Sequence, residues 1–225
     1  MNIMNIAIDG PAGAGKSTVA KLVAKKLGYL YIDTGAMYRA LTFNGMKSGI
    51  NLHDEVKLNE HLISHPIQFL IENEVQRVLI GGEDVTEEIR SPEVTRNVSL
   101  VAAHPLIRKT MTEIQRQLAA QGNVVMDGRD IGTNVLPNAN VKIFLTASIE
   151  ERAKRRYKEL ISTGFPTNLE ELMREISLRD QKDQEREVAP LKMAEDAHHI
   201  ETSDLSIEEV VHKILEYVEE STGGR

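Results

Sequence analysis

In IAIDGPAGAGKST, residues 6–18, an apolar run leads into a glycine-rich loop. The residues before the loop, 3–9, are apolar enough to form a buried strand. After the loop, apolar residues recur with the period of a helix from Thr18 to Leu27, and Gly28 suits the end of that helix. The order strand, glycine loop, helix is typical of a nucleotide-binding α/β fold.

The loop itself fits the pattern G-x-x-x-x-G-K-[ST] from Gly10 to Ser17, in the strand-to-helix context that this motif requires. Glycines allow backbone N–H groups to turn inward around phosphate oxygens, and the N-terminus of the helix adds a partial positive charge. We therefore predict phosphate binding here, with Lys16 at the β- and γ-phosphates and Ser17 as a ligand of Mg²⁺.

Further strands follow this unit along the chain. A short strand at Tyr29–Ile32 completes a βαβ unit, whose two strands should be parallel. Three later segments fit the same sheet, namely residues 123–127, 141–147 and, more weakly, 198–202. The sequence thus predicts an α/β fold with a parallel sheet.

The middle of the chain has a different pattern. Residues 66–86 contain strand-like runs separated by Asn/Glu and Gly-Gly turn signals, which predict a small antiparallel insertion. A helix should begin at Ser91-Pro92, break at His104-Pro105 and continue to about Ala120. Two pairs, Asn168 with Glu171 and Ser206 with Glu209, have the spacing of capping boxes at helix starts.

Composition narrows the class of protein. The 225 residues suit one large domain or a domain with an insertion, with 41% hydrophobic and 27% charged residues and no cysteine. No membrane span or secretion signal is visible, so we expect a cytoplasmic protein. The net charge of −7 argues against a nucleic-acid-coating protein. Residues 1–50, with six Lys/Arg and two Asp/Glu, carry +4, so residues 51–225 carry −11.

The segment after residues 123–127 places an arginine at the end of a predicted strand. It reads Asp127-Gly-Arg129-Asp130, and ligands of open α/β sheets bind at the carboxyl ends of strands. There is no Asn-Lys-x-Asp motif, which disfavours a GTPase. The other arginines in informative positions are Arg39, Arg108, Arg152, Arg155, Arg156, Arg179 and Arg186.

Electrostatics gives these arginines a common purpose. Two phosphate groups of roughly −2 charge each, brought to about 5 Å at an effective dielectric near 20, repel by about 13 kcal/mol. Fixed cations and Mg²⁺ must offset that cost, and the planar fork of arginine matches phosphate best. The pattern therefore favours a kinase whose acceptor is itself phosphorylated.

His61 and His65 have a spacing that is found among metal ligands on a helix, but no third ligand accompanies them. We therefore expect surface or interface histidines.

Taken together, the motifs resemble the nucleoside monophosphate kinases and, within them, the bacterial cytidylate kinases. The resemblance covers nearly the whole chain through IAIDGPAGAGKST, YIDTGAMYRAL, EDVTEEIRSPEV, VMDGRDIGT, VKIFLTAS with ERAKRR, and LRDQKDQERE. DTGAMYRAL and DGRDIGT together are specific to this group. It implies a P-loop kinase fold with a five-stranded parallel sheet, a small antiparallel insertion and a short lid.

The resemblance also implies a division of the chain. Core segments would be 1–38, 111–150 and 168–225, the acceptor-binding region would be 39–110 including the insertion at about 66–86, and the lid would be 151–167. ATP and Mg²⁺ would be the cofactors, and we expect a monomer acting on small molecules, with no nucleic acid or membrane as partner.

The resemblance also assigns residues to ATP, to the three parts of CMP and to catalysis. The ATP phosphates would be held by Gly10, Pro11, Ala12, Gly13, Ala14, Gly15, Lys16, Ser17 and Thr18, with Arg152, Arg155 and Arg156 closing over ATP. The phosphate of CMP would contact Arg39, Arg129 and Arg186. Cytosine would be read by Ser99, Arg108 and Asp130, and the ribose held by Arg179 and Asp183 with Thr34 nearby. The catalytic group would be Lys16, Arg129, Arg155 and Arg186.

The implied reaction is ATP-dependent phosphorylation of CMP, and of dCMP, by in-line transfer. Two alternatives remain open at this stage. A kinase of the same fold could prefer UMP, AMP or another small acceptor, and a P-loop chain could be an ATP-binding regulatory module without turnover.

Overall fold

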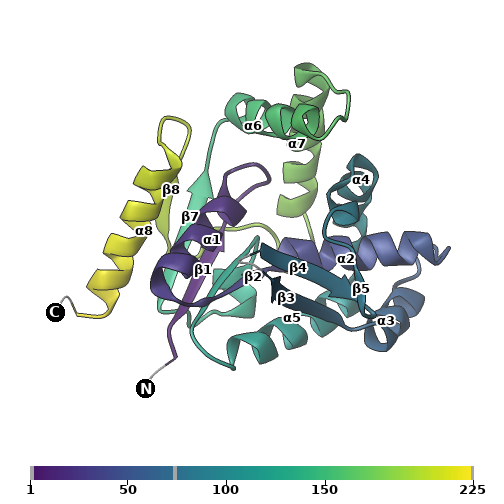
Figure 1. Ribbon diagram of the computed structural model, residues 1–225, viewed down its shortest axis with the longest axis horizontal. Helices are drawn as coiled ribbons and strands as arrows, with labels where there is room; N and C mark the ends of the chain where they lie inside the picture. The colour runs from purple at the N-terminus through teal and green to yellow at the C-terminus, as the bar shows by residue number, and fades with distance from the viewer. Residues whose placement is uncertain (1–2, 73–74, 224–225) are drawn as a thin grey trace. The chain divides into compact units, whose positions relative to one another are not determined.

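Figure 1 shows the computed structural model, which describes residues 3–72 and 75–223. The chain divides into two compact units. Unit 1 combines Met1–Tyr31 with Ala119–Arg225, and unit 2 is Ile32–Leu118. Three short segments lie outside the described residues. They are residues 73–74 of the predicted insertion, and residues 1–2 and 224–225 at the outer ends of the predicted core ranges 1–38 and 168–225. The division into core, acceptor-binding region and lid stays a prediction.

A five-stranded sheet organises unit 1, in the order β2-β6-β1-β7-β8. Its pairs β1–β6, β1–β7 and β7–β8 are parallel, which confirms the predicted sheet. The strands are β1 (Asn5–Asp9), β2 (Leu30–Asp33, whose last two residues belong to unit 2), β6 (Val124–Gly128), β7 (Val141–Thr146) and β8 (His198–Glu201). The central strand β1 runs directly into the glycine loop.

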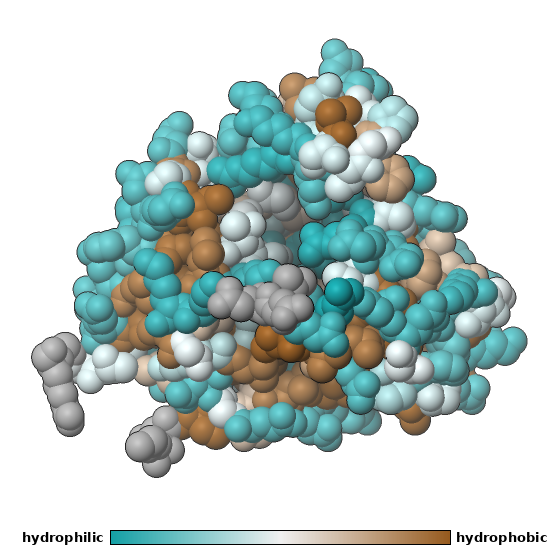
Figure 2. All heavy atoms as spheres, in the orientation of Figure 1, coloured by the Kyte–Doolittle hydropathy of each residue, from teal (hydrophilic) through white to brown (hydrophobic). Residues whose placement is uncertain are grey.

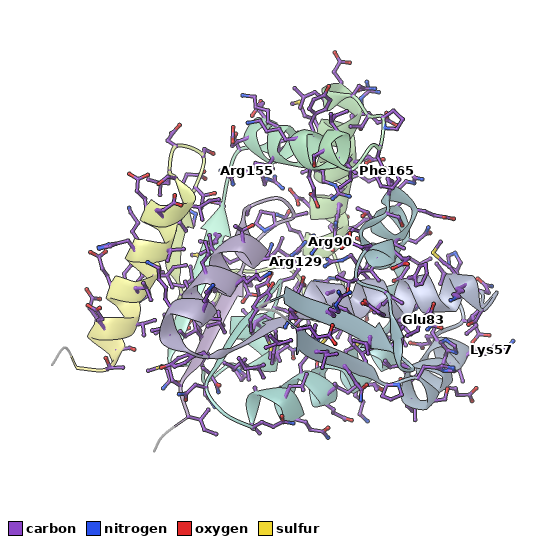
Figure 3. All side chains as sticks on the ribbon, in the orientation of Figure 1. Lys57, Glu83, Arg90, Arg129, Arg155 and Phe165 are labelled. Carbon is purple, nitrogen blue, oxygen red and sulfur yellow. The ribbon has the colours of Figure 1, made fainter. Side chains whose placement is uncertain are left out.

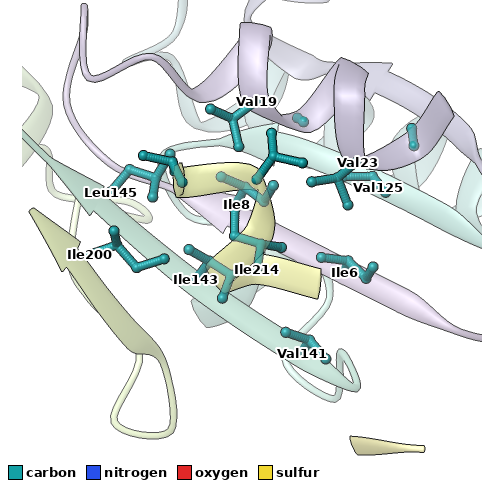
Figure 4. Close-up of a cluster of buried hydrophobic side chains, with 14 of the residues drawn as sticks. Ile6, Ile8, Val19, Val23, Val125, Val141, Ile143, Leu145, Ile200 and Ile214 are labelled. Atoms are coloured by element: carbon teal, nitrogen blue, oxygen red, sulfur yellow. The ribbon is translucent and has the colours of Figure 1, made fainter. Parts of the chain in front are cut away.

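Apolar side chains of the sheet and of two helices form the core of unit 1 (Figure 4). Helix α1 (Lys16–Leu27) contributes Val19 and Val23, and α8 (Ile207–Ser221) contributes Ile214, against strand residues such as Ile8 and Ile143. Each such side chain, when fully buried, stabilises the fold by about 1.5–3 kcal/mol. The core therefore fixes β1 and α1, and with them the loop between the two elements.

Helix starts in unit 1 largely follow the sequence signals. Ser206 and Glu209 form a full capping box at α8, as predicted. The predicted box at Asn168 is only half formed: Asn168 accepts from the N–H of Glu171, but the Glu171 carboxylate contacts the Asn168 amide side chain instead of its backbone. Helix α1 begins at Lys16, two residues before the predicted start, because Gly15 is its N-cap, and it ends at Gly28 as expected.

Helices α6 (Ile149–Ser162) and α7 (Leu169–Gln184) form a hairpin within unit 1. Four residues, Ala153, Leu160, Leu172 and Ile176, give the hairpin a small hydrophobic core of its own. Figure 2 shows hydrophobic residues at the surface in the region that α6 and α7 occupy in Figure 1. The exposed large apolar residues of this hairpin are Ile149, Tyr157, Ile161, Phe165, Leu169 and Leu178.

Unit 2 is built around helix α2 (Thr34–Lys47), which packs against most other elements of that unit. The helices are α3 (Glu55–Ser64), η1 (Glu88–Arg90), α4 (Pro92–Val101) and α5 (Pro105–Ala119, whose last residue belongs to unit 1). A three-stranded antiparallel sheet, β3 (Ile67–Glu72), β4 (Val75–Ile80) and β5 (Glu83–Asp84), confirms the predicted insertion. Ser91 caps α4 through the N–H of Val94, also as predicted.

A search of the described residues for a helix with the length and hydropathy of a membrane span finds none.

Candidate active site

The glycine loop of unit 1 packs so closely that side chains are excluded at two positions. Gly10 has a φ of +144°, and a Cβ there would lie 2.0 Å from the carbonyl oxygen of Leu145 on β7. At Gly13, with φ +77°, a Cβ would lie 3.0 Å from the Cβ of Arg152 on α6. The loop is thus held between the sheet and the start of the α6–α7 hairpin, with its backbone shaped by contacts that only glycine permits.

Lys16 is buried at the beginning of α1, and its Nζ donates to the carbonyl of Pro11 at 2.7 Å. Burial is the main cause that lowers its pKa well below the usual value, followed by the positive charge of Arg129. Lys16 and Arg129 therefore share a neighbourhood in unit 1. A bound polyanion would stabilise the charged form of Lys16.

Asp127 is a site residue whose partners were not apparent from the sequence. It is buried near the carboxyl end of β6, where its Oδ2 accepts from the Ser17 hydroxyl at 3.0 Å and its Oδ1 accepts from the Tyr31 hydroxyl at 2.9 Å. Hydroxyl and carboxylate oxygens are the ligand types that Mg²⁺ prefers, commonly with one or two carboxylates beside substrate phosphates. Ser17 and Asp127 therefore fit a Mg²⁺ site.

Three of the predicted arginines surround one carboxylate. Arg129 Nε lies 3.0 Å from Asp183 Oδ2, and Arg186 Nε donates to the backbone carbonyl of Asp183 at 3.3 Å. Burial raises the pKa of Asp183, but the charges of Arg129, Arg179 and Arg186 outweigh burial and hold the pKa below its ordinary value. Four of the predicted substrate-binding residues are thus brought together beyond the end of β6, with Arg129 labelled in Figure 3.

Asp130 follows Arg129 and is buried, with its Oδ2 accepting from Asn134 Nδ2 at 3.0 Å. The next residues form a single turn of π-helix, η2 (Ile131–Val135). Asp9, at the end of β1, accepts hydrogen bonds from the backbone of this turn. Burial raises the pKa of Asp9 to about 6, against the opposing effect of those N–H groups.

The arginines of α6 differ in their contacts. Arg152 is buried, donates to the carbonyls of Ala147 and Ala12 at 3.0 Å each, and pairs with Asp180 at 2.6 Å. Arg155, labelled in Figure 3, donates to the hydroxyl and carbonyl of Thr202 at 3.1 and 2.7 Å. Arg156 pairs with Glu159 of its own helix at 2.8 Å. The structure therefore brings Arg152 directly to the phosphate loop, while Arg156 contacts its own helix.

The remaining predicted residues belong to unit 2. Thr34 begins α2, and Arg39 on the same helix pairs with Asp33 at 3.1 Å. Arg108 on α5 is buried, donates to the carbonyl of Ala102 at 3.2 Å and lies 5.6 Å from the ring centre of Tyr38. Ser99 lies on α4, which packs against α2.

The two spaced histidines of unit 2 contact each other. The rings of His61 and His65 stack with centres 4.1 Å apart, and His61 Nε2 lies 2.6 Å from Asn44 Oδ1. Both side chains are partly buried. Burial, followed by the charge of His65, lowers the pKa of His61. The stacked rings belong to α3 and its C-cap residue His65, and the hydrogen bond between His61 and Asn44 joins α3 to α2.

Comparisons with known proteins agree over nearly the full length. The cytidylate kinase family model matches residues 6–220. A cytidylate kinase from Geobacillus sp. strain WCH70 is 61% identical over 222 residues, with 99% of each chain covered. One from Bacillus subtilis strain 168 is 56% identical over 219 residues, covering 97% of this chain and 98% of the relative. An uncharacterized protein from Eubacterium ventriosum ATCC 27560 shares the fold, with a TM-score of 0.54 at 12% identity, covering 97% of this chain and 99% of that chain.

Proposed function

The chain belongs to the cytidylate kinase family, and we propose that it transfers the γ-phosphoryl group of ATP to the phosphate of CMP, giving ADP and CDP, with dCMP as a second acceptor. The observation that carries this proposal is the gathering of Arg129, Arg179 and Arg186 around Asp183 in the unit that holds the phosphate loop. A site for one triphosphate needs the loop alone. Additional clustered arginines are required when the acceptor is also a phosphate.

The donor side of the reaction uses the loop and α6. Gly10 to Thr18 hold the phosphates of ATP, and Lys16 exchanges the Pro11 carbonyl for phosphate oxygens. Because burial lowers the pKa of Lys16, a triphosphate beside it restores the charged form. Arg152 is already hydrogen-bonded to the loop at Ala12, and with Arg155 and Arg156 it covers the donor. Exclusion of water then limits loss of ATP to hydrolysis.

Ser17 and Asp127 are the residues that would hold Mg²⁺. Their hydrogen bond of 3.0 Å places a hydroxyl and a buried carboxylate at the first turn of α1, beside the loop. Mg²⁺ held by these residues would neutralise negative charge on the phosphates of the donor. Tyr31 donates to the other oxygen of Asp127 and so fixes the direction of the carboxylate.

The acceptor side uses the arginine cluster of unit 1. Arg129 and Arg186 bind the CMP phosphate, and Arg179 with Asp183 binds the ribose. That phosphate is ionised at neutral pH, so the transfer needs no general base. Catalysis comes from alignment and from cations that stabilise the transferring group. In unit 2, Arg39 contacts the phosphate of CMP and Thr34 lies near its ribose. Ser99 and Arg108 contact the base. Single variants can test each of these roles.

Asp130 is proposed to select the base. Its carboxylate accepts from the exocyclic amine of cytosine, whereas uracil presents a carbonyl at that position. A buried mismatch of this kind costs about 1–3 kcal/mol, or roughly one to two decades in kcat/KM. A kinase preferring UMP is not favoured, since the matched family model and the curated relatives above are cytidylate kinases.

A coupled assay of ADP release tests this function over CMP, dCMP, UMP, AMP and a reaction without acceptor. We expect CMP and dCMP to be used at least tenfold better than UMP. Asp130→Asn is the matched variant, because an amide can donate to the uracil carbonyl and should move the CMP/UMP ratio toward UMP. Equal rates with and without acceptor would contradict a kinase.

Gel filtration tests the expected monomer, and the cytoplasmic location stays a prediction.

A further inference from the structure

Asp9 occupies an unusual place for a carboxylate, because it is buried at the end of the central strand β1 with an exposed fraction of 4%. Its Oδ1 accepts from the N–H of Ile131 at 2.8 Å, and its Oδ2 accepts from the N–H of Gly132 at 2.7 Å. These are the first two N–H groups of the π-helical turn η2. Such groups have no partner within their own turn, so Asp9 supplies a cap from a neighbouring strand.

The capped turn begins directly after two residues of the proposed acceptor site. The carbonyl of Asp130 accepts from the N–H groups of Asn134 and Val135 at 2.9 and 3.1 Å, which closes the turn. Asp9 also pairs in register with Gly128 in the sheet. Arg129 and Asp130 are therefore held on both sides, by the sheet before them and by the capped turn after them.

The surroundings of Asp9 explain why a carboxylate in particular is suited to this position. The charged groups around it are Lys16 on α1, Asp130 before the turn and Lys142 on β7, whose Cδ would lie 3.2 Å from a Cβ built at Gly132. Asp9 Oδ2 would lie 3.4 Å from that same Cβ. The carboxylate presents a separate acceptor oxygen to each of the two N–H groups, whereas an asparagine in the same orientation would place its NH₂ group against one of them.

We propose that Asp9 is a positioning residue for the acceptor, because its carboxylate caps the turn that follows Arg129 and Asp130 and so holds these two residues in place. This inference rests on the proposed function, which assigns Arg129 to the phosphate and Asp130 to the base of CMP. Asp9 itself touches neither substrate in this account. Its removal should therefore impair use of CMP far more than binding of ATP.

Two variants disturb the same contact in different ways. Asp9→Asn keeps the size of the side chain, but its NH₂ group faces one of the two N–H donors and one hydrogen bond is lost. Gly132→Ala leaves all charges unchanged and crowds Asp9 Oδ2 and Lys142 from the side of the turn. Gly122→Ala is the matched control, because a Cβ there meets nothing within 4 Å.

The test combines steady-state kinetics with amide hydrogen exchange of the peptide that covers residues 129–135. We expect Asp9→Asn to lower kcat/KM for CMP by about 10- to 100-fold. The same variant should change the Kd of ATP by less than about threefold and accelerate exchange at Ile131 and Gly132. Gly132→Ala should change the same quantities in the same direction, and Gly122→Ala should match the wild type.

Equal losses for CMP and ATP in both variants would overturn the inference, as would unchanged exchange in 129–135. If Asp9→Asn does not fold, Gly132→Ala decides the question alone, and normal use of CMP by that variant would then contradict the proposal. Wild-type protein that forms no CDP would refute the proposed function. If the wild type forms CDP and Asp9→Asn is equally active, only the role proposed for Asp9 is refuted.

Discussion

Replacing Arg129 with alanine removes the arginine that joins the end of β6 to Asp183. Its side chain is 17% exposed, its Nε lies 3.0 Å from Asp183 Oδ2 and its Nη1 donates to the Gly128 carbonyl at 3.2 Å. The Nη2 group and the second hydrogen of Nη1 are then the donors that can turn to a phosphate. A charge-assisted hydrogen bond contributes about 1.5–3 kcal/mol, so loss of a bidentate contact costs about 3–6 kcal/mol. We expect kcat/KM for CMP to fall by about 10² to 10⁴.

ATP binding should survive the same change. The charge of Arg129 is one of the causes that lower the pKa of Lys16, so its removal favours the charged form of Lys16. The assay is CMP-dependent ADP release, with the Kd of ATP measured separately by calorimetry. Arg174→Ala is the matched control, because that arginine on α7 is 81% exposed and lies 3.6 Å from Glu170. A parallel loss of ATP affinity in Arg129→Ala would refute the assignment of Arg129 to the acceptor.

Three further predictions concern the loop, the metal and pH. Gly10→Ala should lower the free energy of unfolding by at least about 2 kcal/mol more than Gly28→Ala, because only the Cβ at position 10 meets backbone atoms. Urea denaturation measures both losses, and equal losses would contradict this prediction. Ser17→Ala should raise the Mg²⁺ concentration for half-maximal rate by about tenfold, and chelation should abolish transfer; an unchanged requirement would exclude Ser17 as a ligand. The pKa of Asp183 is lowered from 3.8, so its stabilisation is present above pH 3.8 and lost as pH falls through the lower folded value. The wild type's stability advantage over Asp183→Asn should therefore shrink in acid, and a constant difference between pH 7 and pH 3 would argue against it.

Local features of the fold could be predicted from the sequence, because their signals lie within a few residues of one another. The strand before Gly10, the end of α1 at Gly28 and the cap at Ser91 depend on short patterns, and the structure confirms them. The antiparallel insertion followed from turn signals in the same way. The start of α1 was misplaced by two residues because the motif residues Lys16 and Ser17 are themselves helical.

Contacts between distant parts of the chain could not be predicted from such patterns. Ser17 and Asp127 are separated by 110 residues, and Asp9 and Ile131 by 122. Both contacts depend on the register of β1 with β6, which places Asp9 opposite Gly128. Strands β1 and β6 are buried on both faces and are apolar along most of their length, so their hydrophobic pattern does not specify this register.

A competition in one reaction tests the choice of acceptor, with the wild-type protein receiving Mg²⁺ and ATP and equal concentrations of CMP, UMP and AMP. Chromatography then measures CDP, UDP and inorganic phosphate, and ADP formed from AMP is distinguished by an isotopic label on AMP. We predict that CDP is the main product, exceeding UDP at least tenfold, with little inorganic phosphate. A mixture dominated by UDP, by labelled ADP or by inorganic phosphate would contradict the assignment of this chain as a CMP kinase.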